Sequence, residues 1–118
     1  MTTLLIADDH PLFREALRGA VARVLPDAAL READSVDALY GLVEAHADAD
    51  LLLMDLIMPV MDGVEATRQI MARTPCAIVI VTVDRQQNVH RVFEAMGHGA
   101  LDVVDTPALG AGDPREAA

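Results

Sequence analysis

Several kinds of residue that commonly build functional sites are scarce in this sequence. There is one cysteine, Cys76, which excludes an internal disulfide and a metal site made of several cysteines. Tryptophan is absent, and Phe13, Tyr40 and Phe93 are the only aromatic residues, so no aromatic platform can stack nucleic-acid bases. Basic side chains number 9 against 19 acidic ones, and the net charge of -10 argues against a domain that grips a phosphate backbone.

Long hydrophobic runs are also missing. No apolar stretch approaches the length of a membrane span, and the N-terminus lacks a charged-then-apolar leader. We therefore expect a soluble, cytoplasmic protein without a membrane partner. What the sequence does have is 118 residues of which 53% are hydrophobic, enough for one domain with a real core. We assign that domain to residues 1–108 and leave residues 109–118 as a tail.

Short apolar strands alternate with helical patterns along the chain. Strands are predicted at residues 3–7, 30–33, 51–55, 77–81 and 101–104. Apolar residues at helical spacing predict helices that begin near Pro11, Ser35, Gly63 and Val89. This alternation predicts an α/β fold, in which a doubly wound, five-stranded parallel sheet carries helices on both faces.

The tail begins a helical pattern close to the end of the chain. Asp113-Pro114-Arg115-Glu116 has a capping Asp, a Pro at the first helical position and a Glu three residues after the cap. The sequence ends at Ala118, so we expect the last helix to be short or missing. An uncovered sheet face would then favour a homodimer.

Polar side chains stand where three of the predicted strands end. Asp8 and Asp9 follow the first strand, Asp55 closes the third and Thr82 closes the fourth. The carboxyl ends of parallel strands share one edge, and ligands bind there at the point where the strand order reverses. If the second and third strands flank the first, the three carboxylates converge. Read alone, Asp8-Asp9 would more often be an acidic pair that favours the dipole of the following helix.

Carboxylates that converge in this way repel one another, so the cluster needs a cation. An all-oxygen ligand set with retained waters suits Mg²⁺. With the charge screened, Asp55 could attack a phosphoryl donor and form an aspartyl phosphate. Thr82 could then donate a hydrogen bond to a phosphoryl oxygen. The Asp62-Gly63 pair is interpreted as a turn and helix cap, because its spacing from Asp55 does not match a calcium loop.

These residues together resemble a known family. Leu5 to Pro11, Met54 to Pro59 with Asp62-Gly63, and Val81-Thr82 resemble the CheY-like receiver domain of bacterial two-component response regulators. The resemblance covers nearly the whole chain and implies a flavodoxin-like sheet of order 2-1-3-4-5. It implies a histidine kinase or small phosphodonor as the partner. The implied site residues are the phosphoacceptor Asp55, the switch hydroxyl of Thr82, and, as ligands of Mg²⁺, Asp8, Asp9, Asp55 and the backbone carbonyl of Ile57.

The chain departs from this family at the end of the last strand. Receivers usually carry a Lys before a Pro there, whereas Thr106 precedes Pro107 in this sequence. Val103 stands where the family has an aromatic switch residue. A Lys ammonium would pair with the phosphoryl group, and Thr106 cannot supply that charge. Two functions therefore stay open: a phosphoacceptor, or a receiver-fold module for interaction or dimerisation that works without phosphorylation.

The two halves of the chain resemble different branches of the family. Residues 4–53 resemble receivers of LuxR/NarL-type transcription regulators, and residues from 54 onward resemble chemotaxis methylesterase receivers of Wsp-type systems. This mixture favours a hybrid recombined near the central strand over a natural divergent protein. Neither a DNA-binding nor a methylesterase domain is present, so we expect no enzyme beyond Mg²⁺-dependent self-phosphorylation and autodephosphorylation. A stand-alone phosphatase is disfavoured, because Ile57 stands where such enzymes need a second acid.

Overall fold

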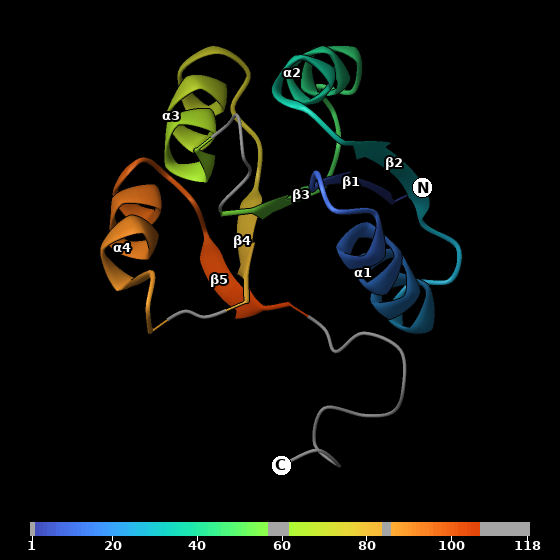
Figure 1. The fold of residues 1–118 in the computed structure, drawn as a ribbon. Helices are drawn as coiled ribbons and strands as arrows, with labels where there is room; N and C mark the ends of the chain where they lie inside the picture. The colour runs from blue at the N-terminus through green and yellow to red at the C-terminus, as the bar shows by residue number, and fades with distance from the viewer. Residues whose placement is uncertain (1, 57–61, 84–85, 107–118) are drawn as a thin grey trace.

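The chain alternates strictly between strands and helices (Figure 1). The computed structural model describes residues 2–56, 62–83 and 86–106. No helix within these ranges is long and apolar enough to cross a membrane. The elements are β1 (Thr3–Ala7), α1 (Pro11–Val24), β2 (Ala29–Ala33), α2 (Val36–Ala45), β3 (Leu51–Asp55), α3 (Gly63–Arg73), β4 (Ile78–Thr82), α4 (Val89–Gly97) and β5 (Asp102–Asp105).

The predicted elements are confirmed, with small differences at strand ends. The observed β2 begins one residue earlier than predicted, and β4 and β5 lie one residue later. Hydrogen bonding decides these ends, and hydropathy does not. Leu101 is apolar and was predicted as the first residue of the last strand, but β5 begins at Asp102. The N–H of Leu101 donates to the carbonyl of Ile78, and its side chain is exposed.

The five strands form one parallel sheet in the order β2-β1-β3-β4-β5, as the resemblance implied. Leu4 of β1 aligns with Leu30 of β2 on one side and with Leu51 of β3 on the other. The chain therefore adds β2 on one side of β1 and β3 on the opposite side. This reversal lies at β1, so the carboxyl ends of β1 and β3 flank the point where ligands bind in such sheets.

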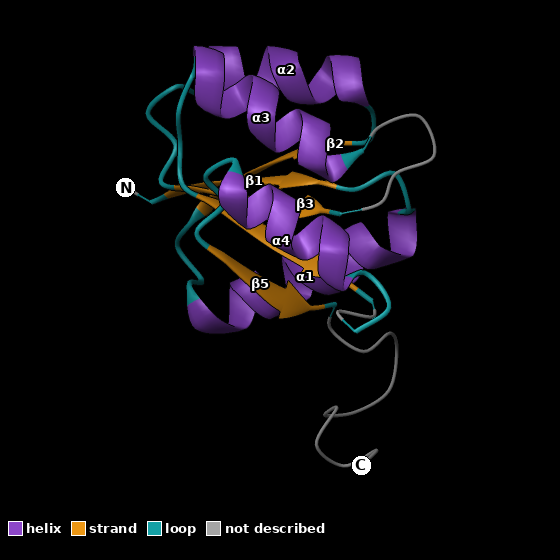
Figure 2. Cartoon of the chain, turned by 90° about the vertical axis from the view of Figure 1, so that its left-hand side faces the viewer, coloured by secondary structure: helices purple, strands orange, loops and turns teal. Residues whose placement is uncertain are grey.

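The two faces of the sheet carry separate hydrophobic clusters. On one face, Leu52 and Ile80 pack with Leu39 of α2, and Ile70 of α3 joins the same cluster. On the other face, Val81 belongs to a smaller cluster with Leu17 of α1. Figure 2 shows α2 and α3 together on one side of the strands. Within the described ranges, α1 is the one helix on the second face.

Beside α1 the second face carries an open apolar groove of about 250 Å³. Leu17 of α1 and the strand residues Leu53, Val81 and Val104 are among its lining. The predicted tail and short last helix fall within residues 107–118, which lie outside the described residues. The expected homodimer therefore stays a prediction.

Candidate functional site

The acidic pair follows β1 directly at the reversal point of the sheet. The side chain of Asp8 is buried, with 2% of the residue exposed. Its backbone N–H donates to the carbonyl of Ala33 in β2 at 3.1 Å, and one carboxylate oxygen accepts from the N–H of His10 at 2.9 Å. These two bonds hold Asp8 against the end of the sheet.

Helix α1 begins after this pair and has a cap of its own. His10 is the N-cap, and its Nδ1 accepts from the N–H of Leu12 at 3.2 Å. Pro11 occupies the first turn as predicted, and no acidic residue lies in that turn. Asp8 and Asp9 therefore lie between the end of β1 and the cap of α1, outside the first turn of the helix.

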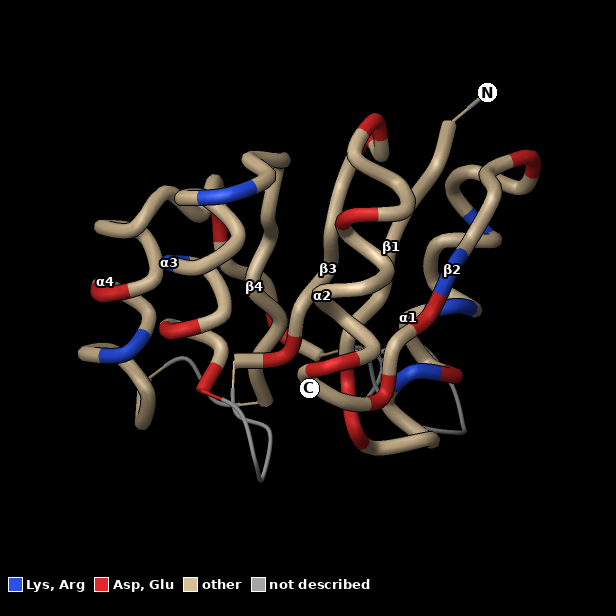
Figure 3. The backbone as a smooth tube through the Cα atoms, turned by 90° about the horizontal axis from the view of Figure 1, so that it is seen from above, with Lys and Arg blue, Asp and Glu red and all other residues tan. Residues whose placement is uncertain are grey.

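Asp55 joins the acidic pair from the neighbouring strand. It is the last residue of β3 and aligns with Val81 of β4. One carboxylate oxygen from each of Asp8, Asp9 and Asp55 lies within 4.8 Å of the others. Figure 3 shows acidic segments along the edge where the strands end. Ile57, the fourth predicted ligand, lies outside the described residues.

The electrostatics of this cluster favour a bound cation. Burial raises the pKa of the Asp8 carboxyl above its ordinary value of 3.8, and the neighbouring Asp9 carboxylate raises it further. The hydrogen bond from His10 and the nearby charges of His10 and Arg14 act in the opposite direction. The ionised form of Asp8 is therefore disfavoured on its own. Carboxylate oxygens are ligands for hard divalent ions, so the cluster fits such an ion.

Replacing Asp8 should relieve this repulsion. We expect Asp8→Asn to stabilise the cation-free protein by about 1 kcal/mol at neutral pH, because the neutral amide still accepts from His10. Folding raises the pKa of Asp8, so the wild type loses stability as the pH rises from 3.8 towards the folded-state pKa. The gain should therefore disappear in acid, where Asp8 is protonated. Urea denaturation in EDTA at an acidic and a neutral pH measures the gain, and a pH-independent gain would contradict this explanation.

Thr82 lies at the end of β4 and is 2% exposed. Its Oγ1 accepts from Nδ2 of Asn88 at 3.3 Å, and its carbonyl accepts from the N–H of Thr106 at 3.0 Å. Position 106 therefore lies beside the end of β4. Members of the family usually carry a Lys at this position. All 9 basic residues of the chain are arginines. Val103 is half-buried and packs against the larger hydrophobic cluster.

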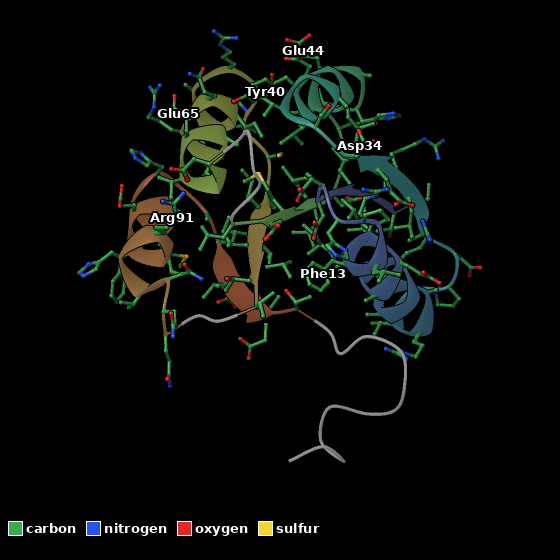
Figure 4. All side chains as sticks on the ribbon, viewed as in Figure 1. Phe13, Asp34, Tyr40, Glu44, Glu65 and Arg91 are labelled. Atoms are coloured by element: carbon green, nitrogen blue, oxygen red, sulfur yellow. The ribbon has the colours of Figure 1, made fainter. Side chains whose placement is uncertain are left out.

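The start of α3 lies next to the end of β3, which carries Asp55. Asp62 caps this helix by accepting from the N–H of Val64 at 2.8 Å, which confirms the interpretation of Asp62-Gly63 as a helix cap. The same carboxylate oxygen lies 2.9 Å from Nη2 of Arg91 on α4, which is labelled in Figure 4. The N–H of Gly63 donates to the carbonyl of Leu56, so the helix begins in direct contact with the end of β3.

Three side chains close to the site make contacts that the sequence does not reveal. Asn88 contacts Thr82, Arg91 contacts the α3 cap, and Arg14 contacts the carbonyl of Asp8. Each belongs to a different element from its partner. The available signal was weak: all three are polar residues at or near a helix start, on the side of the sheet where the strands end.

The response regulator receiver domain model matches residues 4–109. The chain is 68% identical over 114 residues to the protein-glutamate methylesterase/protein-glutamine glutaminase of group 3 operon from Pseudomonas putida. It is 59% identical over 114 residues to protein-glutamate methylesterase/protein-glutamine glutaminase 3 from Pseudomonas aeruginosa. Both matches cover 96% of this chain and 33% of the relative, so the chain spans about a third of their length.

Solved structures show the same fold. The signal receiver domain of the response regulator NarL from Mycobacterium tuberculosis has a TM-score of 0.77 at 27% identity, covering 91% of this chain and 85% of that one. CheY6 from R. sphaeroides, solved in complex with the P1 domain of CheA3, gives a TM-score of 0.75 at 26% identity. That match covers 98% of this chain and 90% of the other.

These relatives change two expectations. The expectation that the protein is no enzyme is wrong, because relatives that match 96% of the chain are named as methylesterases and glutaminases. That expectation considered these 118 residues alone, which span about a third of the length of such relatives. The expected hybrid origin finds no support, since a single relative matches both halves over 114 residues at 68% identity.

Proposed function

Because this chain belongs to the response regulator receiver domain family, we propose that it accepts a phosphoryl group on Asp55 in a Mg²⁺-dependent reaction. The observation that carries the proposal is the convergence of Asp8, Asp9 and Asp55 within 4.8 Å at the reversal point of the sheet. Three carboxylates so close together form an anionic pocket beside the proposed nucleophile. Such a pocket suits a hard cation and, through it, an anionic donor.

The proposed ligands of Mg²⁺ are the carboxylates of Asp8, Asp9 and Asp55, with the backbone carbonyl of Ile57 as the remaining protein ligand. When bound, the cation would neutralise part of the carboxylate charge and polarise the phosphoryl oxygens. The hydrogen bonds of Asp8 to Ala33 and His10 fix the position of this carboxylate in the cluster.

The proposed transfer is a nucleophilic displacement. A carboxylate oxygen of Asp55 attacks phosphorus, and the bond from phosphorus to the leaving group breaks. The bonding electrons leave with acetate when the donor is acetyl phosphate, or with the imidazole when it is a phosphohistidine. Thr82 is proposed to donate to a phosphoryl oxygen. Its oxygen already accepts from Asn88, which leaves the hydroxyl proton available.

We propose a histidine kinase or a small phosphodonor as the cytoplasmic source of the phosphoryl group. Support comes from CheY6, which has been solved in complex with the P1 domain of CheA3 and resembles this chain over 98% of its length. We further propose that the receiver serves a protein-glutamate methylesterase/protein-glutamine glutaminase, the activity named for its relatives.

Intact mass spectrometry after incubation with acetyl phosphate and Mg²⁺ tests the proposal. We expect one phosphoryl adduct on the wild type and none on Asp55→Asn, because the amide cannot serve as the nucleophile. Asp48→Asn is a matched control, since Asp48 is exposed in the turn after α2. A wild type without an adduct would refute the proposal and favour a receiver-fold module that works without phosphorylation.

A further inference from the structure

Arg14 links the acidic pair to the second strand of the sheet. It lies in the first turns of α1, and its Nη1 donates to the backbone carbonyl of Asp8 at 2.8 Å. Its Nε lies 3.4 Å from Oε1 of Glu32 on β2, and its side chain is 20% exposed. One guanidinium thus bridges a strand end and a neighbouring strand, which its planar fork of donors allows.

The carbonyl that Arg14 holds belongs to the peptide between Asp8 and Asp9. The orientation of this peptide determines where both side chains leave the backbone. The N–H of Asp8 is already bound to Ala33 and its carboxylate to His10. Arg14 therefore holds the peptide that sets the spacing between the two carboxylates.

Glu32 determines how Arg14 acts on this site. Its other carboxylate oxygen, Oε2, lies 2.6 Å from Nη1 of Arg18. Glu32 aligns with Ile6 in the pairing of β1 and β2, so it is carried by the strand that neighbours the acidic pair. A carboxylate this close offsets the positive charge of Arg14. An unpaired guanidinium in the same place would repel a cation more strongly.

We propose that Arg14 is a positioning residue for a divalent cation at the acidic pair. It acts through the backbone of Asp8 and contacts the cation with none of its own atoms. The inference rests on the metal site of the proposed function. Groups that orient metal ligands in this way commonly change metal affinity by about tenfold or more when they are removed.

The chain supplies a matched control on the same helix. Arg18 also binds Glu32, but within the described residues it makes no hydrogen bond to Asp8. Arg14→Met and Arg18→Met each remove one guanidinium and one contact to Glu32. Only Arg14→Met also removes the bond to the acidic pair. A difference between the two variants therefore reports the contact to Asp8.

Divalent cation affinity is the first measurement, using Mn²⁺ detected by electron paramagnetic resonance and Mg²⁺ by competition. We expect Arg14→Met to weaken binding about tenfold. Arg18→Met should stay within about twofold of the wild type, because it loses only an exposed ion pair. Arg14→Lys should also weaken binding, since a single ammonium cannot bridge Asp8 and Glu32 together.

Hydrogen exchange without any cation is the second measurement. The N–H of His10 donates to the Asp8 carboxylate and should exchange faster in Arg14→Met than in Arg18→Met. Equal effects of the two substitutions on affinity would overturn the inference, as would tighter binding by Arg14→Met or wild-type affinity in Arg14→Lys. These outcomes would refute the role of Arg14 alone. A wild type that binds no cation would refute the proposed metal site as well, so the failure of the inference and the failure of the proposed function can be told apart.

Discussion

Gly63→Ala is expected to lower the free energy of unfolding by about 3 kcal/mol. A Cβ at this position would lie 2.6 Å from the carbonyl oxygen of Leu56, 2.8 Å from that of Asp55 and 2.9 Å from the Cα of Leu56. All three atoms are backbone and cannot turn aside as a flexible side chain can. Gly63 does not have a positive φ, so backbone strain is not the cause. The loss of stability comes from the steric clash with the backbone at the end of β3. Urea denaturation measures the loss.

The same substitution at Gly41 provides the control. Gly41 lies inside α2, and apart from its chain neighbours and the adjacent helix backbone no heavy atom comes within 4 Å of a Cβ placed there. Gly41→Ala should stabilise the protein by about 0.5–1 kcal/mol, because alanine is the better helix former. Opposite signs at the two glycines would identify contact with β3 as the cause. A small or absent loss in Gly63→Ala would show that α3 can move away from Asp55 at little cost.

Saturating Mg²⁺ is expected to raise the free energy of unfolding by about 2.7 kcal/mol at a concentration near one hundred times the dissociation constant. The reason is that the folded chain alone brings Asp8, Asp9 and Asp55 together. Asp8→Asn should lose most of this gain. The order of stability should therefore reverse: the variant is more stable in EDTA, and the wild type is more stable with Mg²⁺. Thermal unfolding at fixed protein concentration measures both.

Two controls separate cation binding from general salt effects. Sodium chloride at matched ionic strength should give none of the Mg²⁺-dependent gain, because screening acts mainly on exposed charges. Asp48→Asn removes an exposed carboxylate elsewhere and should respond to Mg²⁺ as the wild type does. An equal response of Asp8→Asn and the wild type would place the cation outside the acidic cluster.

Much of the fold was predictable because the local signals agree. Five short apolar runs alternate with helical patterns, and turn or capping residues such as Pro11, Ser35 and Asp62 mark where helices begin. Strand ends were less predictable by one residue, because hydrogen bonds to neighbouring strands define them. The strand order came from the resemblance and could not have come from hydropathy, which says nothing about which strands are neighbours.

The site was predictable to the extent that the sheet alone positions it. Asp8, Asp9 and Asp55 come together because parallel strands end at one edge. The surrounding contacts depend on how helices pack, which periodicity does not reveal. Arg14 has the appearance of a solvated helical charge in the sequence, whereas in the structure it spans β2 and the end of β1. His10 is an unusual cap, since imidazole is not among the side chains preferred at that position.

The place of β1 between β2 and β3 has a consequence for how the protein is made. Asp8 and Asp9 leave the ribosome long before Asp55, and β1 cannot pair with β3 until residues 51–55 have been synthesised. At about 5–20 residues per second, that interval lasts roughly 2 to 10 seconds. Of its two neighbours in the sheet, β1 can pair in this interval only with β2, once residues 29–33 have been synthesised. A nascent chain therefore has two of the three carboxylates of the acidic cluster, and the cluster is completed by Asp55, the proposed phosphoacceptor, only when the central strand is in place.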